Sequence, residues 1–281
     1  MDVARPLALQ TEHTIEVAGH GDTVVREHAG PEGAPVLMLL HGLGATAALN
    51  WGRCYGALSQ HFRVLSLDHR GHGRGLRTRR FRLEQCADDA VAAAEALGVK
   101  RFIAVGYSMG GPIAALTWRR HPERVSGLVL CATARHFVPR PFARLARATL
   151  PIAAQATRRI PRLAHRTMIR RMLARIEHPE LRERVERELL GHEPATVVQA
   201  ADALTHFSSH DWIGEVDVPA AVVITTRDVL VPPARQYKLA ASIPGARVFE
   251  VDDDHDACVR DRGFPETLVR ACRAVAQKET P

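Results

Sequence analysis

The chain has 281 residues, of which 46% are hydrophobic and 25% charged, and its net charge is +7; this is an ordinary globular mixture that can bury a sizeable core. Its five cysteines are widely spaced and form no CxxC pair, which argues against a disulfide framework and against a Cys-type zinc site. We expect these cysteines to be small core residues of a protein in a reducing compartment. No apolar run approaches the roughly 18 residues of a membrane span, and the N-terminus lacks the apolar region of a signal peptide, so we expect a soluble, cytoplasmic protein.

The first half of the chain alternates between strand and helix patterns. Residues 11–28 predict two strands separated by a turn at Gly-His-Gly-Asp. Helical patterns cover 83–97, where Gly98 ends the helix, and 111–120. Short apolar runs that suit strands buried on both faces stand at 36–40, 63–67, 102–106 and 126–131. Strands that alternate with helices predict an α/β fold with a mostly parallel central sheet and right-handed crossovers.

The alternation then stops for a long segment. Residues 136–210 contain no strand-like run and read as several helices punctuated by prolines. The later strand patterns and the last helix stand at 220–225, 247–251 and 264–276. We therefore predict one core domain, formed by residues 1–135 and 211–281, with a helical insertion at 136–210.

The positive charge is concentrated in this insertion. Of the 35 arginines, 14 lie between Arg135 and Arg187, where only four residues are acidic. This patch is either the solvated face of Arg- and Ala-rich helices or a surface for an anionic ligand or a membrane. Aromatic residues make up only 5% of the chain and do not interleave with the arginines, so we expect no nucleic acid partner.

The strongest local signal is Gly106-Tyr107-Ser108-Met109-Gly110, which lies between a predicted buried strand and a helix. So tight a turn strains the serine backbone, needs small residues two before and two after it, and projects the Ser108 hydroxyl above the sheet. The following helix N-terminus favours an anion at the same place. Taken alone, the segment could also be a glycine-rich turn with an incidental serine.

A second glycine-containing loop, His41-Gly42-Leu43-Gly44, follows the strand predicted at 36–40. Glycine there lets backbone amides turn toward a ligand. The N–H groups of Leu43 and Met109 could then converge on a developing oxyanion. Alone, the loop could equally be one that simply requires glycine.

A serine hydroxyl is a poor nucleophile unless a base takes its proton. His255 follows the last predicted strand, and Asp228 follows the strand predicted at 220–225, so that the acid lies between serine and histidine in chain order. The loop after 126–131 holds no carboxylate, which favours Asp228 as the acid. Solvated or turn-forming roles are expected for the neighbours of the histidine, Asp252, Asp253, Asp254 and Asp256.

Taken in order, several motifs resemble the α/β-hydrolase superfamily over about residues 30–275, in its serine-nucleophile, esterase- and lipase-like branch with a helical cap. They are HGLG at 41–44, Asp68-His69-Arg70-Gly71-His72-Gly73, GYSMGG at 106–111, RDVLVP at 227–232 and the late His255. The resemblance implies the α/β-hydrolase fold, a nucleophile elbow at Ser108, a catalytic triad of Ser108, His255 and Asp228, and an oxyanion hole formed by the amides of Leu43 and Met109. It implies no cofactor and no metal.

The resemblance also gives structural roles and two departures. Asp68 and Arg70 are expected to brace the loop beside the active site. Many relatives have glycine where this chain has Thr226 and Asp254, which leaves the geometry of those two loops open.

The identity of the nucleophile narrows the chemistry. Haloalkane dehalogenases and epoxide hydrolases resemble this pattern but carry aspartate where this chain has Ser108. Ser108 therefore points to hydrolysis of an ester, thioester or lactone through an acyl-enzyme, with an apolar small-molecule substrate. A C–C bond hydrolase or perhydrolase with the same triad is one alternative, and a hydrolase-like binding protein without turnover is another.

The insertion at 136–210 stands where the superfamily places its cap, and we expect it to set substrate selectivity. Its apolar positions either line an acyl pocket or pack the cap onto the core; they are Phe142, Leu145, Leu150, Ile152, Ile160, Leu163, Met168, Ile169, Met172, Leu173 and Ile176.

The histidine pairs do not predict a metal site. His69 and His72 lack a third positioned ligand, and so do His206 and His210, which are four residues apart and could share a helix. No G-x-G-x-x-G segment follows the first strands, so we expect no dinucleotide.

Overall fold

The computed structural model describes residues 10–137, 140–159, 162–173 and 179–277. Its sheet has eight strands: β1 (Gln10–Val17), β2 (Gly21–His28), β3 (Val36–Leu40), β4 (Arg63–Leu67), β5 (Phe102–Tyr107), β6 (Val125–Cys131), β7 (Ala220–Thr225) and β8 (Arg247–Val251). The strands lie in the order β1-β2-β4-β3-β5-β6-β7-β8. Pairing of β2 with β1 and with β4 is antiparallel, and every other pairing is parallel, which confirms the predicted mostly parallel sheet.

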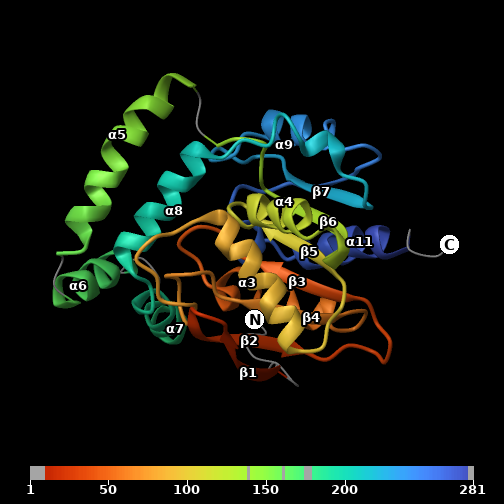
Figure 1. Cartoon of the computed structure of the whole chain (residues 1–281), viewed down its shortest axis with the longest axis horizontal. Helices are drawn as coiled ribbons and strands as arrows, with labels where there is room; N and C mark the ends of the chain where they lie inside the picture. Colours follow the sequence, from red (N-terminus) through yellow and green to blue (C-terminus); the bar gives the residue numbers. More distant parts are fainter. Residues whose placement is uncertain (1–9, 138–139, 160–161, 174–178, 278–281) are drawn as a thin grey trace.

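Helices connect the strands and cover both faces of the sheet (Figure 1). They are α1 (Ala47–Trp51), α2 (Tyr55–Leu58), α3 (Leu83–Ala96), α4 (Gly110–Arg120), α5 (Arg140–Thr157), α6 (Arg162–Met172), α7 (Pro179–Leu190), α8 (Pro194–His206), α9 (Pro233–Ala240), α10 (Ala257–Arg260) and α11 (Phe264–Ala276), with short 3-10 turns at Pro122–Arg124 and Ile213–Glu215. Four of these helices, α1, α2, α9 and α10, are too short to show a helical period and could not be predicted from the sequence.

Two apolar cores explain why the central strands read as continuous apolar runs. In β3, Leu37 and Leu39 join the cluster that includes residues of α1, α2 and α11, whereas Met38 and Leu40 join the cluster with α3 and α4. Alternate side chains of a strand point to opposite faces, so both faces must be apolar when both are covered. All five cysteines are free and buried in these cores, as predicted.

The helices α5 to α8 follow β6 and precede β7, where the sequence predicts the insertion, and α5 packs along α8. They project to one side of the sheet (Figure 1). Ile169 and Leu173 are buried, but the apolar side chains of Leu145, Ile152 and Met168 are exposed and do not pack onto the core. Outside the described residues lie Ile160 and Ile176, together with the side chains of Phe142, Leu163 and Met172.

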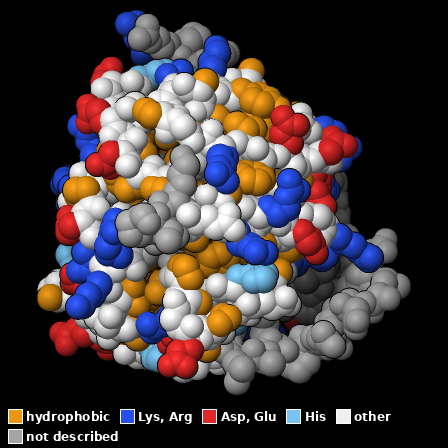
Figure 2. Space-filling model, turned by 90° about the vertical axis from the view of Figure 1, so that its right-hand side faces the viewer, with side chains coloured by type: hydrophobic (Ala, Val, Ile, Leu, Met, Phe, Trp, Pro, Cys, Tyr) orange, Lys and Arg blue, Asp and Glu red, His pale blue; other side chains and the backbone are white. Residues whose placement is uncertain are grey.

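Figure 2 shows the face turned away from α5 and α6, where basic and acidic side chains are interspersed. Within the described ranges, no helix is both long and apolar enough to cross a membrane.

Candidate active site

Ser108 stands at the carboxyl end of β5, directly before α4. Its φ of 51° is in the left-handed region, which is strained for a residue with a side chain. The turn is so tight that a Cβ at Gly106 would lie 2.1 Å from the carbonyl oxygen of Gly110. A Cβ at Gly110 would lie 2.0 Å from the carbonyl oxygen of Leu40. The two glycines are therefore required by the packing of the backbone around the serine, as the sequence predicts.

His255 and Asp228 meet Ser108 from two different loops. His255 lies between β8 and α10, and its Nε2 is 2.9 Å from the hydroxyl oxygen of Ser108. Its Nδ1 is 2.7 Å from Oδ2 of Asp228, which follows β7. A carboxylate only accepts hydrogen bonds, so Nδ1 carries the proton and Nε2 of the neutral ring can accept one from Ser108. The structure thus brings together the three residues predicted from the sequence.

The carboxylate of Asp228 is buried but fully hydrogen-bonded. Its Oδ1 accepts the backbone N–H groups of Leu230 and Val231 at 2.9 and 2.8 Å. Its Oδ2 also accepts from the Thr225 hydroxyl at 2.9 Å and from Nε2 of Gln236 at 3.2 Å. Burial by itself would raise the pKa of Asp228, but the hydrogen bonds from His255 and the Val231 amide outweigh it and lower the pKa. The acid is therefore held ionised beside the imidazole.

Sequence reasoning missed several residues that hold the triad in place. Thr225 and Gln236 orient the Asp228 carboxylate, and Gln236 comes from α9, which was not predicted. Tyr107 donates its hydroxyl to the carbonyl oxygen of His255 at 2.8 Å, which anchors the histidine loop. The G-x-S-x-G pattern leaves the position of Tyr107 unspecified, so it carried no signal for this residue.

The aspartates around His255 have other partners. Asp252 contacts the Thr226 hydroxyl at 3.0 Å, and Asp254 pairs with Arg260 at 2.5 Å. The sequence predicted solvated or turn-forming roles for these aspartates, and the contacts show that Asp252 and Asp254 also bind neighbouring side chains at the surface. Thr226 and Asp254, which depart from the family pattern, leave the contact between Asp228 and His255 intact.

The glycine loop after β3 lies beside the serine. A Cβ at Gly42 would be 3.5 Å from Cβ of Ser108, and the Gly42 amide is held by Oδ1 of Asn50 at 3.0 Å. Within the part of the chain that the structure describes, the N–H groups of Leu43 and Met109 donate to no protein group. Both amides are thus available to a ligand.

Two imidazole rings contact the backbone carbonyl groups of the residues on either side of Leu43. Nδ1 of His41 lies 2.8 Å from the carbonyl oxygen of Gly42, and Nε2 of His192 lies 3.0 Å from that of Gly44. The second nitrogen of each ring accepts a backbone N–H, from His69 at 2.8 Å and from Gly73 at 2.9 Å respectively. Because one nitrogen must donate and the other must accept, both rings are bound as neutral tautomers.

These rings belong to a cluster of four histidines, in which His41, His69 and His72 are buried and His192 is half-buried. The ring centroids of His41 and His69 are 4.2 Å apart, those of His41 and His72 5.4 Å, and those of His72 and His192 5.1 Å. Burial lowers the pKa of His41, His72 and His192, and it lowers that of His69 to about 3. The cluster is therefore uncharged near neutral pH.

The predicted bracing by Asp68 and Arg70 is present. Asp68 accepts the backbone N–H groups of Ala47 and Arg74 at 2.8 and 2.9 Å, which joins the two loops beside the site. Arg70 forms a bidentate ion pair with the carboxylate of Asp89 in α3, with N–O distances of 2.6 and 2.7 Å. These contacts connect the loop to the core rather than to a reacting group.

His206 and His210 do not share a helix, because α8 ends at His206. His210 lies beyond it, with Nε2 2.8 Å from Nδ1 of His136. Across the described residues, no three histidine, cysteine or acidic side chains are grouped so that they could hold a metal ion.

Comparison with known proteins agrees with this architecture. The chain is 28% identical over 223 residues to a protein of Agrobacterium fabrum whose name proposes a carbamate hydrolase, RutD, covering 78% of this chain and 85% of that one. It is 29% identical over 221 residues to a pimeloyl-acyl-carrier-protein methyl ester esterase of Chromobacterium violaceum, covering 77% and 85% of the two chains. The crystal structure of an enol-lactonase from Burkholderia xenovorans LB400 matches with a TM-score of 0.74 and 25% identity, covering 92% of this chain and 98% of that one.

The profile of the family described as the alpha/beta hydrolase fold matches residues 35–260, a range that contains all three residues of the Ser108–His255–Asp228 chain. The protein is therefore a hydrolase that belongs to the α/β-hydrolase fold family.

Proposed function

We propose that this protein is a serine hydrolase that cleaves a carboxylic ester or lactone through an acyl-enzyme intermediate. The observation that carries the proposal is the continuous hydrogen-bonded chain from Ser108 through His255 to Asp228, with distances of 2.9 and 2.7 Å. This is the arrangement in which a base can remove the serine proton while a carboxylate stabilises the resulting imidazolium.

The proposed reaction has two similar halves. Ser108 Oγ attacks the carbonyl carbon and passes its proton to Nε2 of His255. The oxyanion that forms is held by the amides of Leu43 and Met109. Its collapse expels the alcohol, which takes the proton from Nε2 and leaves an ester on Ser108. Water then repeats the sequence, releasing the carboxylic acid and restoring the free serine.

The surroundings of the triad support an apolar acyl substrate. Leu43, which belongs to the glycine loop, is 37% exposed, and Val229 and Leu230, directly after the acid, are 82% and 68% exposed. The relatives' names refer to a carbamate, a methyl ester and an enol-lactone, all of which present a carbonyl carbon to a nucleophile. The same triad also suits C–C bond hydrolysis, but none of the three names indicates it.

Labelling with a fluorophosphonate probe tests the nucleophile directly. Wild-type protein should form a covalent adduct on Ser108 and should hydrolyse p-nitrophenyl esters or lactones. Ser108→Ala should remain folded, lose labelling, and lose about 10³-fold or more of its turnover. A folded Ser108→Ala protein that keeps its esterase rate would disprove the mechanism. An unlabelled wild-type protein would favour a binding protein without turnover.

A further inference from the structure

A basic groove runs between the loop 77–82 and the helices α5, α6 and α8. Its larger part has a volume of about 1050 Å3 and is lined by Arg77, Arg79, Arg158 and Arg166, and Glu193 is the one acidic residue among the described residues of this lining. A smaller pocket of about 400 Å3 adjoins it and shares Arg79 and Arg158. We call these two spaces together the arginine groove. It is large enough for a ligand well beyond a single inorganic ion.

The charge of the groove is only partly neutralised by the described part of the protein. Among the described residues, no carboxylate lies within ion-pair distance of Arg79 or Arg158. Arg77 reaches Glu193 at 3.9 Å, and Arg166 reaches Glu186 at 3.5 Å. The surrounding sequence adds to the excess, because residues 136–176 contain ten arginines and no aspartate or glutamate. Elsewhere many arginines are paired with carboxylates, as Arg70 is with Asp89 and Arg120 with Asp88. The groove thus carries an excess of positive charge, centred on Arg79 and Arg158.

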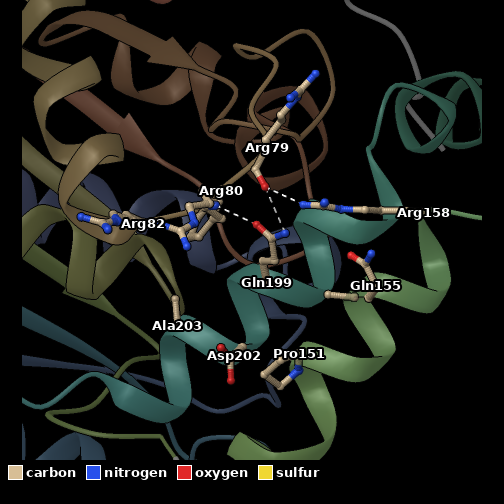
Figure 3. Close-up of a pocket in the computed structure, with 11 residues that line it drawn as sticks. Arg79, Arg80, Arg82, Pro151, Gln155, Arg158, Gln199, Asp202 and Ala203 are labelled. Atoms are coloured by element: carbon tan, nitrogen blue, oxygen red, sulfur yellow. Dashed lines mark hydrogen bonds between the residues drawn. The ribbon is translucent and has the colours of Figure 1, made fainter.

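The walls of the groove are held together by hydrogen bonds to the loop 77–82. Arg158 reaches across from α5 and donates to the carbonyl oxygen of Arg79 at 2.7 Å (Figure 3). Gln199 of α8 donates to the same oxygen at 3.2 Å and accepts the Phe81 amide at 2.9 Å. Arg158 uses only one of its five N–H donors in this contact, which leaves the others for a ligand.

The remaining charged residues limit where a ligand can sit. Arg82 points to the other side of the loop, away from α5 (Figure 3), so it does not contribute directly. Asp202 lines the smaller pocket from α8, with His206 as its ion-pair neighbour at 3.6 Å. The anionic part of a ligand therefore belongs at the larger end, where Arg79 and Arg158 meet Arg77 and Arg166.

We propose that the arginine groove binds a ligand that carries phosphate groups. A guanidinium group presents a planar fork of N–H donors that matches phosphate oxygens. Arg79 and Arg158, which have no carboxylate partner among the described residues, stand beside Arg77 and Arg166 on one concave surface, and this favours a polyanion over a single carboxylate. The site is distinct from the Ser108–His255–Asp228 chain, and the proposal does not depend on the proposed hydrolysis.

Isothermal titration calorimetry of the full chain with inorganic pyrophosphate at low ionic strength tests the site. Wild-type protein should bind pyrophosphate saturably, and the double variant Arg79→Gln/Arg158→Gln should bind at least about tenfold more weakly. Arg247→Gln is the matched control, because it removes an exposed charge from β8, at the far edge of the sheet. No binding to wild type, or equal binding to the double variant, would overturn the proposal.

Both substituted side chains are exposed, so the double variant should keep the wild-type unfolding temperature and its turnover of a small neutral ester. These two readouts separate the groove from the catalytic proposal. Loss of pyrophosphate binding with unchanged turnover supports the groove whatever the natural substrate proves to be.

Vesicles distinguish a free phosphate compound from a lipid headgroup as the source. If the ligand is a lipid, the protein should co-sediment with phosphatidylglycerol vesicles. The double variant Leu145→Gln/Ile152→Gln alters exposed apolar residues of α5, so it should abolish this co-sedimentation and leave pyrophosphate binding intact. A free phosphate ligand predicts pyrophosphate binding without sedimentation. Vesicle binding that survives in Arg79→Gln/Arg158→Gln would contradict the assignment of the phosphate site to this groove.

Discussion

His192, in the turn between α7 and α8, donates from Nε2 to the carbonyl oxygen of Gly44 at 3.0 Å while its Nδ1 accepts the Gly73 amide at 2.9 Å. One side chain thereby joins the insertion helices to the glycine loop that carries the Leu43 amide. The Thr46 hydroxyl donates to the carboxylate of Glu188 in α7 at 2.7 Å, so a second hydrogen bond joins the insertion helices to this loop region. The position of the proposed oxyanion donor thus depends on a residue more than a hundred positions away in the sequence.

His192→Ala should therefore reduce turnover without removing any atom of the triad. Loss of one oxyanion donor costs about 10²–10³-fold in rate, and a displaced donor should cost part of that, about tenfold in kcat with a smaller change in KM. His206→Ala, at the exposed end of α8, is the control and should behave as wild type. The kinetic constants on a p-nitrophenyl ester decide the matter, and an unchanged kcat would show that Gly44 is positioned without His192.

The histidine cluster should make the fold sensitive to acid. Both ring nitrogens of His69 are buried without a partner, and burial lowers its pKa to about 3 from about 6.5 in the unfolded chain. Between these values the unfolded chain binds the proton and the folded chain does not, so this contribution to stability is complete above about pH 6.5 and is lost as the pH falls toward 3. Each fully titrating histidine contributes a slope of about 1.4 kcal/mol per pH unit.

His69→Leu isolates this effect. The substitution removes the buried polar ring but keeps the backbone N–H that donates to His41. Urea unfolding measured from pH 7 to pH 5 should show a shallower loss of stability in the variant than in wild type. A variant with the same slope as wild type would place the acid sensitivity elsewhere in the molecule.

The glycines of the serine turn should be much less replaceable than a glycine with open space. A methyl group at Gly110 would collide with the Leu40 carbonyl, which belongs to the backbone and cannot rotate away. We expect Gly110→Ala to lose about 1–3 kcal/mol of unfolding free energy, and turnover with it. Gly56 in α2 has no atom near the position of a Cβ, so Gly56→Ala should be neutral or stabilising by up to about 1 kcal/mol. Equal stability of the two variants in urea unfolding would contradict this account of the turn.

The proposed triad could be predicted from the sequence because each of its residues closely follows a strand that is recognisable from its run of apolar residues. Carboxyl ends of parallel strands meet at one edge of a sheet, so the residues that follow β5, β7 and β8 must converge. Ser108 was further marked by Gly106 and Gly110, two residues before and after it, where any side chain would collide with a backbone carbonyl group. The glycine spacing around Ser108 and the convergence of the strand ends therefore indicate the same site.

The supporting residues could not be predicted in this way. His192 has no local motif, and its partners Gly44 and Gly73 lie 148 and 119 positions away in the sequence. Gln236 lies on a helix of eight residues, which is too short for a clear apolar period. Leu145 and Ile152 resemble core residues in composition, but a sequence does not reveal whether anything packs opposite them, and here they are exposed.

The assignment of Asp228 as the acid gives the sharpest test of the site. Its Oδ2 accepts from Nδ1 of His255 at 2.7 Å, and four further hydrogen bonds, from Leu230, Val231, Thr225 and Gln236, fix the carboxylate. Asp228→Asn keeps the shape of the side chain but can donate to Nδ1, which allows the imidazole to place its proton on Nε2, the atom that must receive the serine proton. By analogy with the same substitution in a serine protease, kcat should fall about 10⁴-fold.

The flanking aspartates supply the matched controls. Asp252→Asn and Asp254→Asn change a carboxylate in the histidine loop in the same way, but these groups face Thr226, Arg227 and Arg260 rather than the ring. Each should therefore keep kcat within a few-fold of wild type, a small effect beside the loss of about 10⁴-fold expected at Asp228. Steady-state kinetics on one ester substrate compares all three variants, with thermal unfolding to confirm that each is folded. If Asp254→Asn cripples turnover while Asp228→Asn does not, the acid is misassigned, although Ser108 could still be the nucleophile.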